Sequence, residues 1–238
     1  MSLNLHFHGH GTYTIEIDGV KLLVDPFFTG NPAATITTEQ VEADYILVTH
    51  GHGDHIGDLV AVAKRLGVLV ICNFEIAGWL ARQGVSLTHG GNLGGGYQHP
   101  FGYLKFTVAH HTSGLPDGSY GGNPAGFLLR TGKYNVYLAG DTALFGDMQL
   151  LAEEDLDLAV LPIGDNFTMG PADALRAASW IKARNYVPVH YDTWPPIAQD
   201  GAAWCRDVEA RTSARAHPLK AGETWALVGT GGPGRFAG

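Results

Sequence analysis

Cysteine is scarce in this sequence, and two other features are missing. Only Cys72 and Cys205 occur among the 238 residues, which is too few for a disulfide-stabilised scaffold and is typical of a reducing compartment. No apolar run approaches the roughly 20 residues that a membrane span requires. The first residues also lack the basic region and long apolar core of a signal peptide. We therefore expect a cytoplasmic protein that does not act in a membrane.

Positively charged residues are also few. The chain has 15 Lys and Arg against 23 Asp and Glu, a formal net charge of -8. Such a balance argues against a phosphate-backbone footprint, so we expect a small-molecule substrate and no nucleic-acid partner. A homo-oligomer is compatible with this composition.

Linkers and charged blocks are absent as well. With 45% apolar residues, the chain is long enough for one well-buried domain. We expect a single domain over residues 1–238, built from two similar halves at about 1–105 and 106–230. The glycine-rich segment 231–236 is expected to be disordered.

Histidine, in contrast, is abundant and clustered. Twelve are present, and four potential metal ligands (His50, His52, Asp54 and His55) fall within six positions. They follow the apolar run 45–48, so a strand should end just before them. A surface turn needs Gly or Asp but gains nothing from three imidazoles. The spacing favours a two-metal site, with imidazole and carboxylate ligands that suit zinc, iron or manganese.

Both halves of the chain begin with strands and continue with alternating strands and helices. Helices outside two packed mixed sheets are the simplest architecture for that order, an α/β protein with a four-layer αββα sandwich. Local patterns predict a hairpin turn at Asp18-Gly19 and a helical turn over 37–40. They also predict a flexible loop over 90–96 and helices over 58–66, 148–154, from 171, and over 198–214.

The cluster and several later motifs resemble the metallo-β-lactamase superfamily. Thr49-His50-Gly51-His52-Gly53-Asp54-His55 resembles its signature, and Asp25-Pro26, His111-Thr112-Ser113, Gly140-Asp141-Thr142 and Val189-His190-Tyr191 match its other motifs in order. Gly9-His10 and the block Ile163-Gly164-Asp165-Asn166-Phe167-Thr168-Met169-Gly170 are similar to a bacterial and archaeal branch of metal-dependent hydrolases. Related branches include L-ascorbate-6-phosphate lactonase and N-acylphosphatidylethanolamine phospholipase D.

This resemblance implies a metallo-β-lactamase fold and a site with two divalent metal ions, zinc or manganese. One metal would be held by His50, His52 and His111. The other would be held by Asp54, His55 and His190, with Asp141 bridging the two. Two such cations can share a hydroxide and polarise a substrate oxygen, and Asp54 can orient that nucleophile or accept its proton.

The third histidine of the first group is ambiguous from the residues alone. Strand alternation places His110 on the core side with Leu104 and Phe106, and His111 on the other side with Lys105. The family motif aligns with His111, which we choose as the ligand. His110 is then expected to serve packing or to support a ligand.

Four further residues are expected near the metals. His10 should support a ligand or face the substrate, and Asp25 should fix the ring of a ligand histidine. Asp165 and Asn166 should shape the pocket, although Asn166 could equally cap the following helix. His6 and His8 are expected to be structural.

The resemblance therefore favours a dinuclear metal hydrolase that acts on a small ester, lactone or phosphodiester. One alternative is a nucleotide or nucleic-acid phosphodiesterase, which the acidic composition disfavours. The alternatives from other classes are a di-iron redox protein and a non-catalytic metal-binding protein. Redox relatives usually carry Glu in place of one histidine, whereas this chain has His52 at the second position of the motif.

Overall fold

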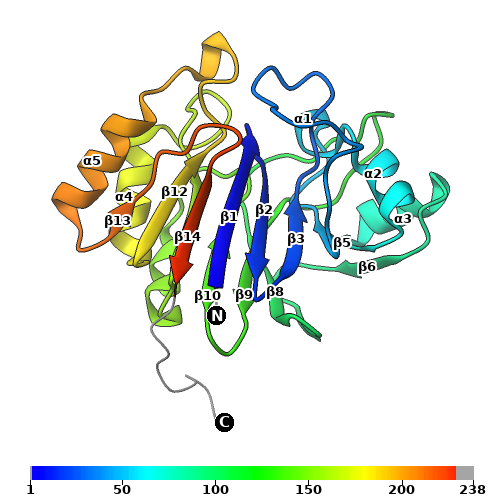
Figure 1. Ribbon diagram of the computed structural model, residues 1–238, viewed down its shortest axis with the longest axis horizontal. Helices are drawn as coiled ribbons and strands as arrows, with labels where there is room; N and C mark the ends of the chain where they lie inside the picture. Colours follow the sequence, from blue (N-terminus) through cyan, green and yellow to red (C-terminus); the bar gives the residue numbers. More distant parts are fainter. Residues whose placement is uncertain (1, 229–238) are drawn as a thin grey trace.

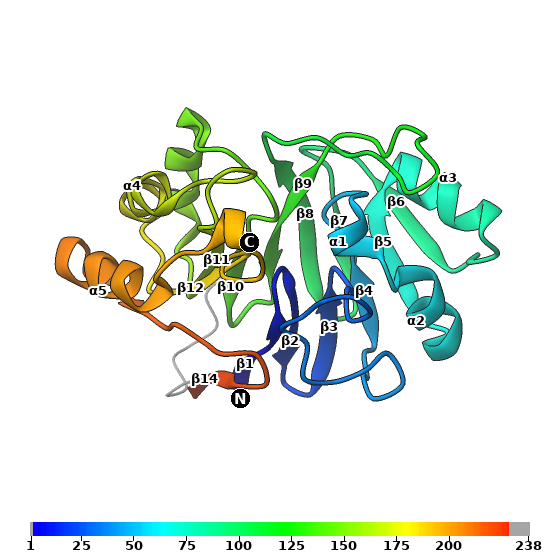
Figure 2. The same cartoon turned by 90° about the horizontal axis from the view of Figure 1, so that it is seen from above.

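Two seven-stranded mixed sheets pack face to face, with helices on both outer sides (Figures 1 and 2). The computed structural model describes residues 2–228, so the expected disordered segment 231–236 lies outside the described range. The layers run helices, sheet, sheet, helices, which confirms the predicted αββα sandwich.

The first sheet contains the strands up to residue 91 and the last strand of the chain. Neighbours from β14 to β3 are antiparallel, and those from β3 to β6 are parallel. Its order is β14 (Thr224–Val228), β1 (Ser2–Gly9), β2 (Thr12–Ile17), β3 (Val20–Val24), β4 (Tyr45–Leu47), β5 (Leu69–Asn73) and β6 (Thr88–Gly91).

The second sheet repeats this plan. Neighbours from β7 to β10 are antiparallel, and those from β10 to β13 are parallel. Its order is β13 (Arg215–Ala216), β12 (Asn185–Val189), β11 (Leu158–Pro162), β10 (Asn135–Leu138), β9 (Ala125–Arg130), β8 (Gly102–Val108) and β7 (Gly96–His99).

Three apolar clusters hold the four layers together. The cluster between the sheets takes alternate residues of both, such as Leu5 and Ile15 from one and Phe127 and Leu138 from the other. One further cluster joins each sheet to its helices. Each strand that contributes to two clusters is therefore apolar on both faces, as parallel strands covered by helices require.

The helices largely follow the predicted ones. The predicted helix over 148–154 is a 3-10 helix, and that over 198–214 is shorter and follows a separate 3-10 turn. No helix within residues 2–228 is long and apolar enough to cross a membrane. The helices are α1 (Gly53–Ile56), α2 (Leu59–Leu66), α3 (Phe74–Arg82), η1 (Gly146–Glu154), α4 (Pro171–Ile181), η2 (Pro195–Ile197) and α5 (Gly201–Arg211).

Three local predictions met different outcomes. The Asp18-Gly19 hairpin is confirmed, because both residues have positive φ (49° and 91°) between β2 and β3. Residues 37–40 form a single hydrogen-bonded turn, in which the Thr37 amide donates to the side chain of Gln40 (2.9 Å) as in a capping box. The loop predicted over 90–96 is wrong at both ends, since Gly91 ends β6 and Gly96 begins β7. A Cβ on either glycine would lie 2.2 Å from an aromatic side chain of β8, so close packing, not flexibility, requires glycine there.

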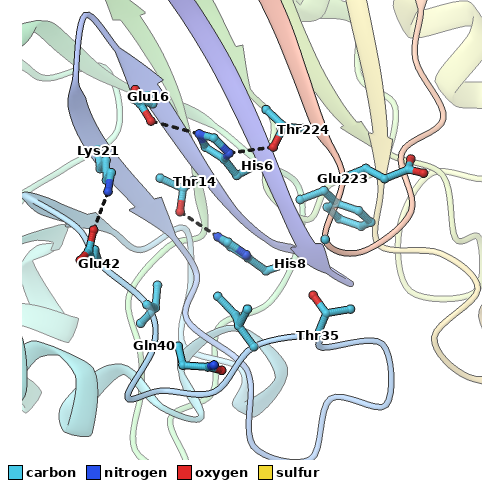
Figure 3. Close-up of a pocket in the computed structure, with 14 residues that line it drawn as sticks. His6, His8, Thr14, Glu16, Lys21, Thr35, Gln40, Glu42, Glu223 and Thr224 are labelled. Carbon is cyan, nitrogen blue, oxygen red and sulfur yellow. Dashed lines mark hydrogen bonds and ion pairs between the residues drawn. The ribbon is translucent and has the colours of Figure 1, made fainter.

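The outer face of β1 and β2 carries no helix (Figure 1). Its side chains are polar and pair with one another: the His6 ring contacts Glu16 and Thr224, and the His8 ring contacts Thr14 (Figure 3). A solvated face of this kind is usual for antiparallel strands. His6 and His8 thus belong to the outer surface.

Candidate metal centre

The segment after β4 supplies four of the predicted ligands. His50 is fully buried and His52 is half-buried. The chain then turns into α1, where the amide of His55 donates to the carbonyl of His52 (3.0 Å). This tight turn sends Asp54 and His55 towards a different group of side chains from that of the first two histidines.

Two groups of potential ligand atoms that share no residue result, each within 4.8 Å, and a third group, of Asp25, His50 and His55, overlaps both. His50, His52 and His111 form the first group. Asp54, His55 and His190 belong to the second, together with His10. Their segments follow the ends of β4, β8 and β12, which open at the same edge of the sandwich. The structure thus brings together the two ligand triplets that the sequence resemblance implies.

Asp141 lies between the two groups. Its Oδ2 is 4.0 Å from Nε2 of His50 and 3.6 Å from that of His111, both in the first group. The same oxygen is 3.4 Å from Nε2 of His55 and 3.0 Å from that of His190, both in the second. One carboxylate oxygen therefore faces four imidazole nitrogens, the geometry that a bridging ligand requires.

Several buried nitrogens in the second group have no hydrogen-bond partner among residues 2–228. They are Nε2 of His55 and both ring nitrogens of His190. Buried polar atoms are normally satisfied by a protein group, a water or an ion. The two unpartnered Nε2 atoms face Asp141, so a cation at this position would satisfy all three side chains. The residues present therefore fit a metal.

The first group is electrostatically suited to a cation. Burial lowers the pKa of His50, His52 and His111, most strongly for the fully buried His50. These imidazoles are therefore neutral near pH 7. A neutral imidazole offers a free lone pair, which metal ligation needs.

The second group behaves in the opposite way. Burial opposes the charged form of His190, but Asp141 outweighs it and raises the pKa to about 9. The same competition raises the pKa of His55, with Asp25 adding to the effect of Asp141. Burial also opposes ionisation of Asp141, yet His190 and His55 hold its pKa well below the usual value. Without metal, protons thus supply the positive charge that these carboxylates require.

Asp25 organises ligands of both groups. Its Oδ2 accepts from Nδ1 of His55 (2.8 Å) and from the hydroxyl of Thr49 (2.6 Å), and its Oδ1 accepts from the Thr49 amide (2.8 Å). The Thr49 oxygen in turn accepts from Nδ1 of His50 (3.0 Å). Each Nδ1 then carries a proton, and both Nε2 atoms face the centre, that of His50 at 3.0 Å from Nδ1 of His52.

His10 also reaches the second group. Its Nε2 lies 3.1 Å from Oδ2 of Asp54, and its Nδ1 lies 2.9 Å from the hydroxyl oxygen of Thr193. The ring packs against those of His190 and Trp194, with centroids at 4.0 and 4.8 Å. Burial lowers the pKa of His10 to about 4 against the opposing effect of Asp54, so its ring is neutral.

Backbone strain is concentrated in the same region. Nine non-glycine residues within 2–228 have positive φ, a conformation that costs about 1–3 kcal/mol and gathers at functional sites. Five of the nine are predicted site residues: His10, Asp25, Asp165, Asn166 and His190.

His110 does not lie where alternation placed it. Its side chain is exposed and stacks on Phe145 with ring centroids 4.8 Å apart, so the prediction of a core-side position is wrong. The reason is that β8 ends at Val108, beyond which the two-residue period no longer applies. His111, not His110, lies within the first ligand group.

Asp165 and Asn166 lie beside the centre without joining either ligand group. Their loop is tied to the Asp141 segment, because the Met169 amide donates to the carbonyl of Thr142 (2.9 Å). The Asp165 carboxylate accepts from the Asn166 amide (2.9 Å). No side chain within the described range 2–228 caps α4, so the alternative role of Asn166 as a helix cap does not apply.

Three supporting residues escaped the sequence interpretation. Thr49 hydrogen-bonds to His50, and Thr193 hydrogen-bonds to His10. Ser113 accepts from the Gly51 amide (3.0 Å) and donates to the carbonyl of Gly121 (2.9 Å). Thr49 and Ser113 adjoin motif histidines, which is a usable signal. Thr193 lies 183 positions from His10 along the chain, and its neighbours in the sequence give no such signal.

Comparison with known proteins shows the family of this chain. The family described as Beta-lactamase superfamily domain matches residues 20–191. A UPF0173 metal-dependent hydrolase of Heliobacterium modesticaldum is 47% identical over 237 residues, covering 96% of this chain and 99% of the relative. One from Thermus thermophilus is 46% identical over 225 residues, covering 94% and 99%.

A solved structure is similar along nearly the whole chain. Igni18, described as a novel metallo hydrolase from the archaeon Ignicoccus hospitalis, has a TM-score of 0.87 at 32% identity, covering 97% of this chain and 100% of the other. The family match, the relatives and the fold agree with the motifs quoted above. The chain belongs to the metallo-β-lactamase superfamily, within its UPF0173 metal-dependent hydrolases.

Proposed function

We propose that this metal-dependent hydrolase is dinuclear and acts on a small ester, lactone or phosphodiester with two zinc or manganese ions. The observation that carries the proposal is the position of Asp141 Oδ2, within 4.0 Å of four imidazole nitrogens from two separate ligand groups. A single metal would leave the ligand atoms of one group without a cation.

The ligand assignment follows the two groups. His50, His52 and His111 would hold one ion through three neutral nitrogens. Asp54, His55 and His190 would hold the other, and Asp141 would contact both. Two cations so placed supply a hydroxide nucleophile near neutral pH and polarise the substrate oxygen.

Asp54 is the carboxylate that can take part in proton transfer. Its side chain is 31% exposed, whereas that of Asp141 is 4% exposed and that of Asp25 is 2% exposed. Burial opposes its ionisation, but the hydrogen bond from His10 and the nearby rings of His190 and His55 outweigh this and hold its pKa far below the usual value. An ionised carboxylate open to the substrate can orient a nucleophilic water or accept its proton.

The charge around the centre favours small substrates. No Lys or Arg occurs in the segments that carry or adjoin the ligands: 25–44, 48–58, 109–123, 139–146, 163–170 and 190–200. A polyanionic chain binds through several such cations. We therefore place nucleic acid last among the substrates and a neutral or singly charged ester or lactone first.

Metal analysis combined with a substrate panel tests this function. We expect two metals per purified chain, and metal-dependent hydrolysis of at least one member of a panel of esters, lactones and phosphodiesters. His50→Ala and Asp54→Asn should abolish turnover without unfolding the protein, whereas His89→Ala, a histidine outside both groups, should not. One metal per chain, or full turnover by His50→Ala, would contradict the proposal.

A further inference from the structure

The β1–β2 turn contacts the three ligands that are assigned to the second metal alone. The His10 ring meets Asp54, and the His10 carbonyl accepts from the amide of His190 (2.9 Å). Gly11 adjoins His55 so closely that a Cβ there would lie 2.9 Å from the ring carbon Cε1. Residues 10 and 11 thus form one wall of the second ligand group.

A β-bulge turns the chain towards the centre at this point. Outward-facing His6 and His8 would be followed by an outward His10 if β1 continued regularly. Instead the pairing with β2 shifts between Phe7 and Gly9, and Gly9 and His10 adopt φ values of 106° and 58°. Bulges beside active sites commonly re-aim a side chain in this way.

The hydrogen bonds of His10 form a chain from Thr193 to Asp54. A carboxylate only accepts, so the 3.1 Å contact between Nε2 of His10 and Asp54 places the ring proton on Nε2. In that tautomer Nδ1 is an acceptor. The Thr193 hydroxyl, 2.9 Å away, can then donate to Nδ1, and the Tyr191 carbonyl, 3.3 Å from the same hydroxyl, is its other acceptor. The chain Thr193 to His10 to Asp54 is therefore directional.

We propose that His10 is the positioning residue of the second metal: it holds the Asp54 side chain through its ring and the His190 backbone through its carbonyl. Thr193 keeps the ring in the donating tautomer. This inference rests on the proposed dinuclear site. Since His10 itself lies within the second ligand group, direct ligation by its ring is the competing outcome.

Stepwise zinc affinities of the metal-free protein test the proposal. They are measured by competition with a chromophoric chelator, and His190→Ala identifies the step that belongs to the second metal. Loss of an outer partner typically weakens binding about 10–100-fold. We expect His10→Ala to weaken binding of the second zinc by this factor and to change the affinity for the first zinc less than about 3-fold. His10→Gln keeps a donor near the position of Nε2 and should restore most of the affinity.

Two matched sets of variants complete the experiment. Thr193→Val should weaken binding of the second zinc, and Thr193→Ser should not. If His10→Ala fails to fold, this pair of variants tests the proposal instead. His8→Ala, the neighbouring outward histidine in Figure 3, should leave both steps unchanged.

The outcomes separate the hypotheses. An unchanged second step in His10→Ala, or equal loss at both steps, overturns the positioning role. Loss in His10→Gln as deep as in His10→Ala also overturns it, in favour of direct ligation. A single zinc step in the wild-type protein contradicts the dinuclear site itself, and the role of His10 falls with it.

Discussion

Replacing Asp25 separates its contribution to folding from its contribution to metal binding. The side chain is 2% exposed and accepts three hydrogen bonds, from the Thr49 amide, the Thr49 hydroxyl and Nδ1 of His55. In Asp25→Ala the hydroxyl can rotate to another acceptor, but the other two buried donors cannot. Each unsatisfied donor costs about 1–3 kcal/mol, so we expect a loss of about 2–6 kcal/mol. That is a large part of a typical domain stability.

Asp25→Asn is therefore the sharper variant. Its amide oxygen can still accept from the Thr49 amide, while its NH2 group replaces the oxygen that faces Nδ1 of His55. Two donors cannot face each other, so the His55 proton should move to Nε2, which points at Asp141 Oδ2 (3.4 Å). A protonated Nε2 cannot ligate, and we expect the second metal to bind about 10–100-fold more weakly.

The assay combines zinc titration by chelator competition with urea unfolding of the metal-free protein. Asp44→Asn is the matched control, since the exposed Asp44 carboxylate accepts from the amide of Lys21 (2.8 Å), away from both ligand groups. The control should leave both zinc affinities unchanged. If Asp25→Asn binds both metals as tightly as the wild type, the ring-fixing argument is refuted.

Two further predictions concern protonation and the choice between neighbouring histidines. The pKa of His190 is raised from 6.5 to about 9, so its stabilising effect on the metal-free protein is full below pH 6.5 and is lost as pH rises towards 9. Zinc must displace that proton, so the affinity for the second zinc should rise by up to about tenfold per pH unit between pH 6.5 and 9. The Tm of the metal-free protein should fall over the same pH range. A zinc affinity that does not change with pH would contradict this prediction. His111→Ala should weaken the first step beyond the about 10–100-fold of an outer partner, whereas His110→Ala should change it less than about 3-fold; equal effects would overturn the choice of His111.

Much of the architecture could be predicted from local patterns. The Asp18-Gly19 turn and the helix start at Pro171 follow from the backbone preferences of single residues. The prediction of a flexible loop at Gly91 and Gly96 is wrong because a run of glycines has the same local pattern whether it is flexible or packed under aromatic rings. The rings that require glycine there belong to β8, and a local pattern carries no information about that contact.

The ligand set came from motifs, while its organisation came from the fold. The chemistry of four ligands within 50–55 is visible in one short segment. That Asp141 faces both groups depends on the segment after β10 lying against the segment after β4, where a Cβ on Gly140 would lie 2.9 Å from Thr49 Cβ; spacing alone does not predict this contact. Thr193 is the extreme case, because a threonine far along the chain acquires its role only through contact with His10.

The two histidines for which strand periodicity misleads share a physical cause. His110 comes two residues after the last residue of β8, and His10 follows the bulge at the end of β1. Ligands that must converge on one point from two sheets cannot stay on regular strands, because alternation sends side chains perpendicular to each sheet rather than beyond its edge. Periodicity therefore stops where the centre begins. Beyond that point, residue chemistry such as the ability of imidazole to donate and to ligate is the better guide.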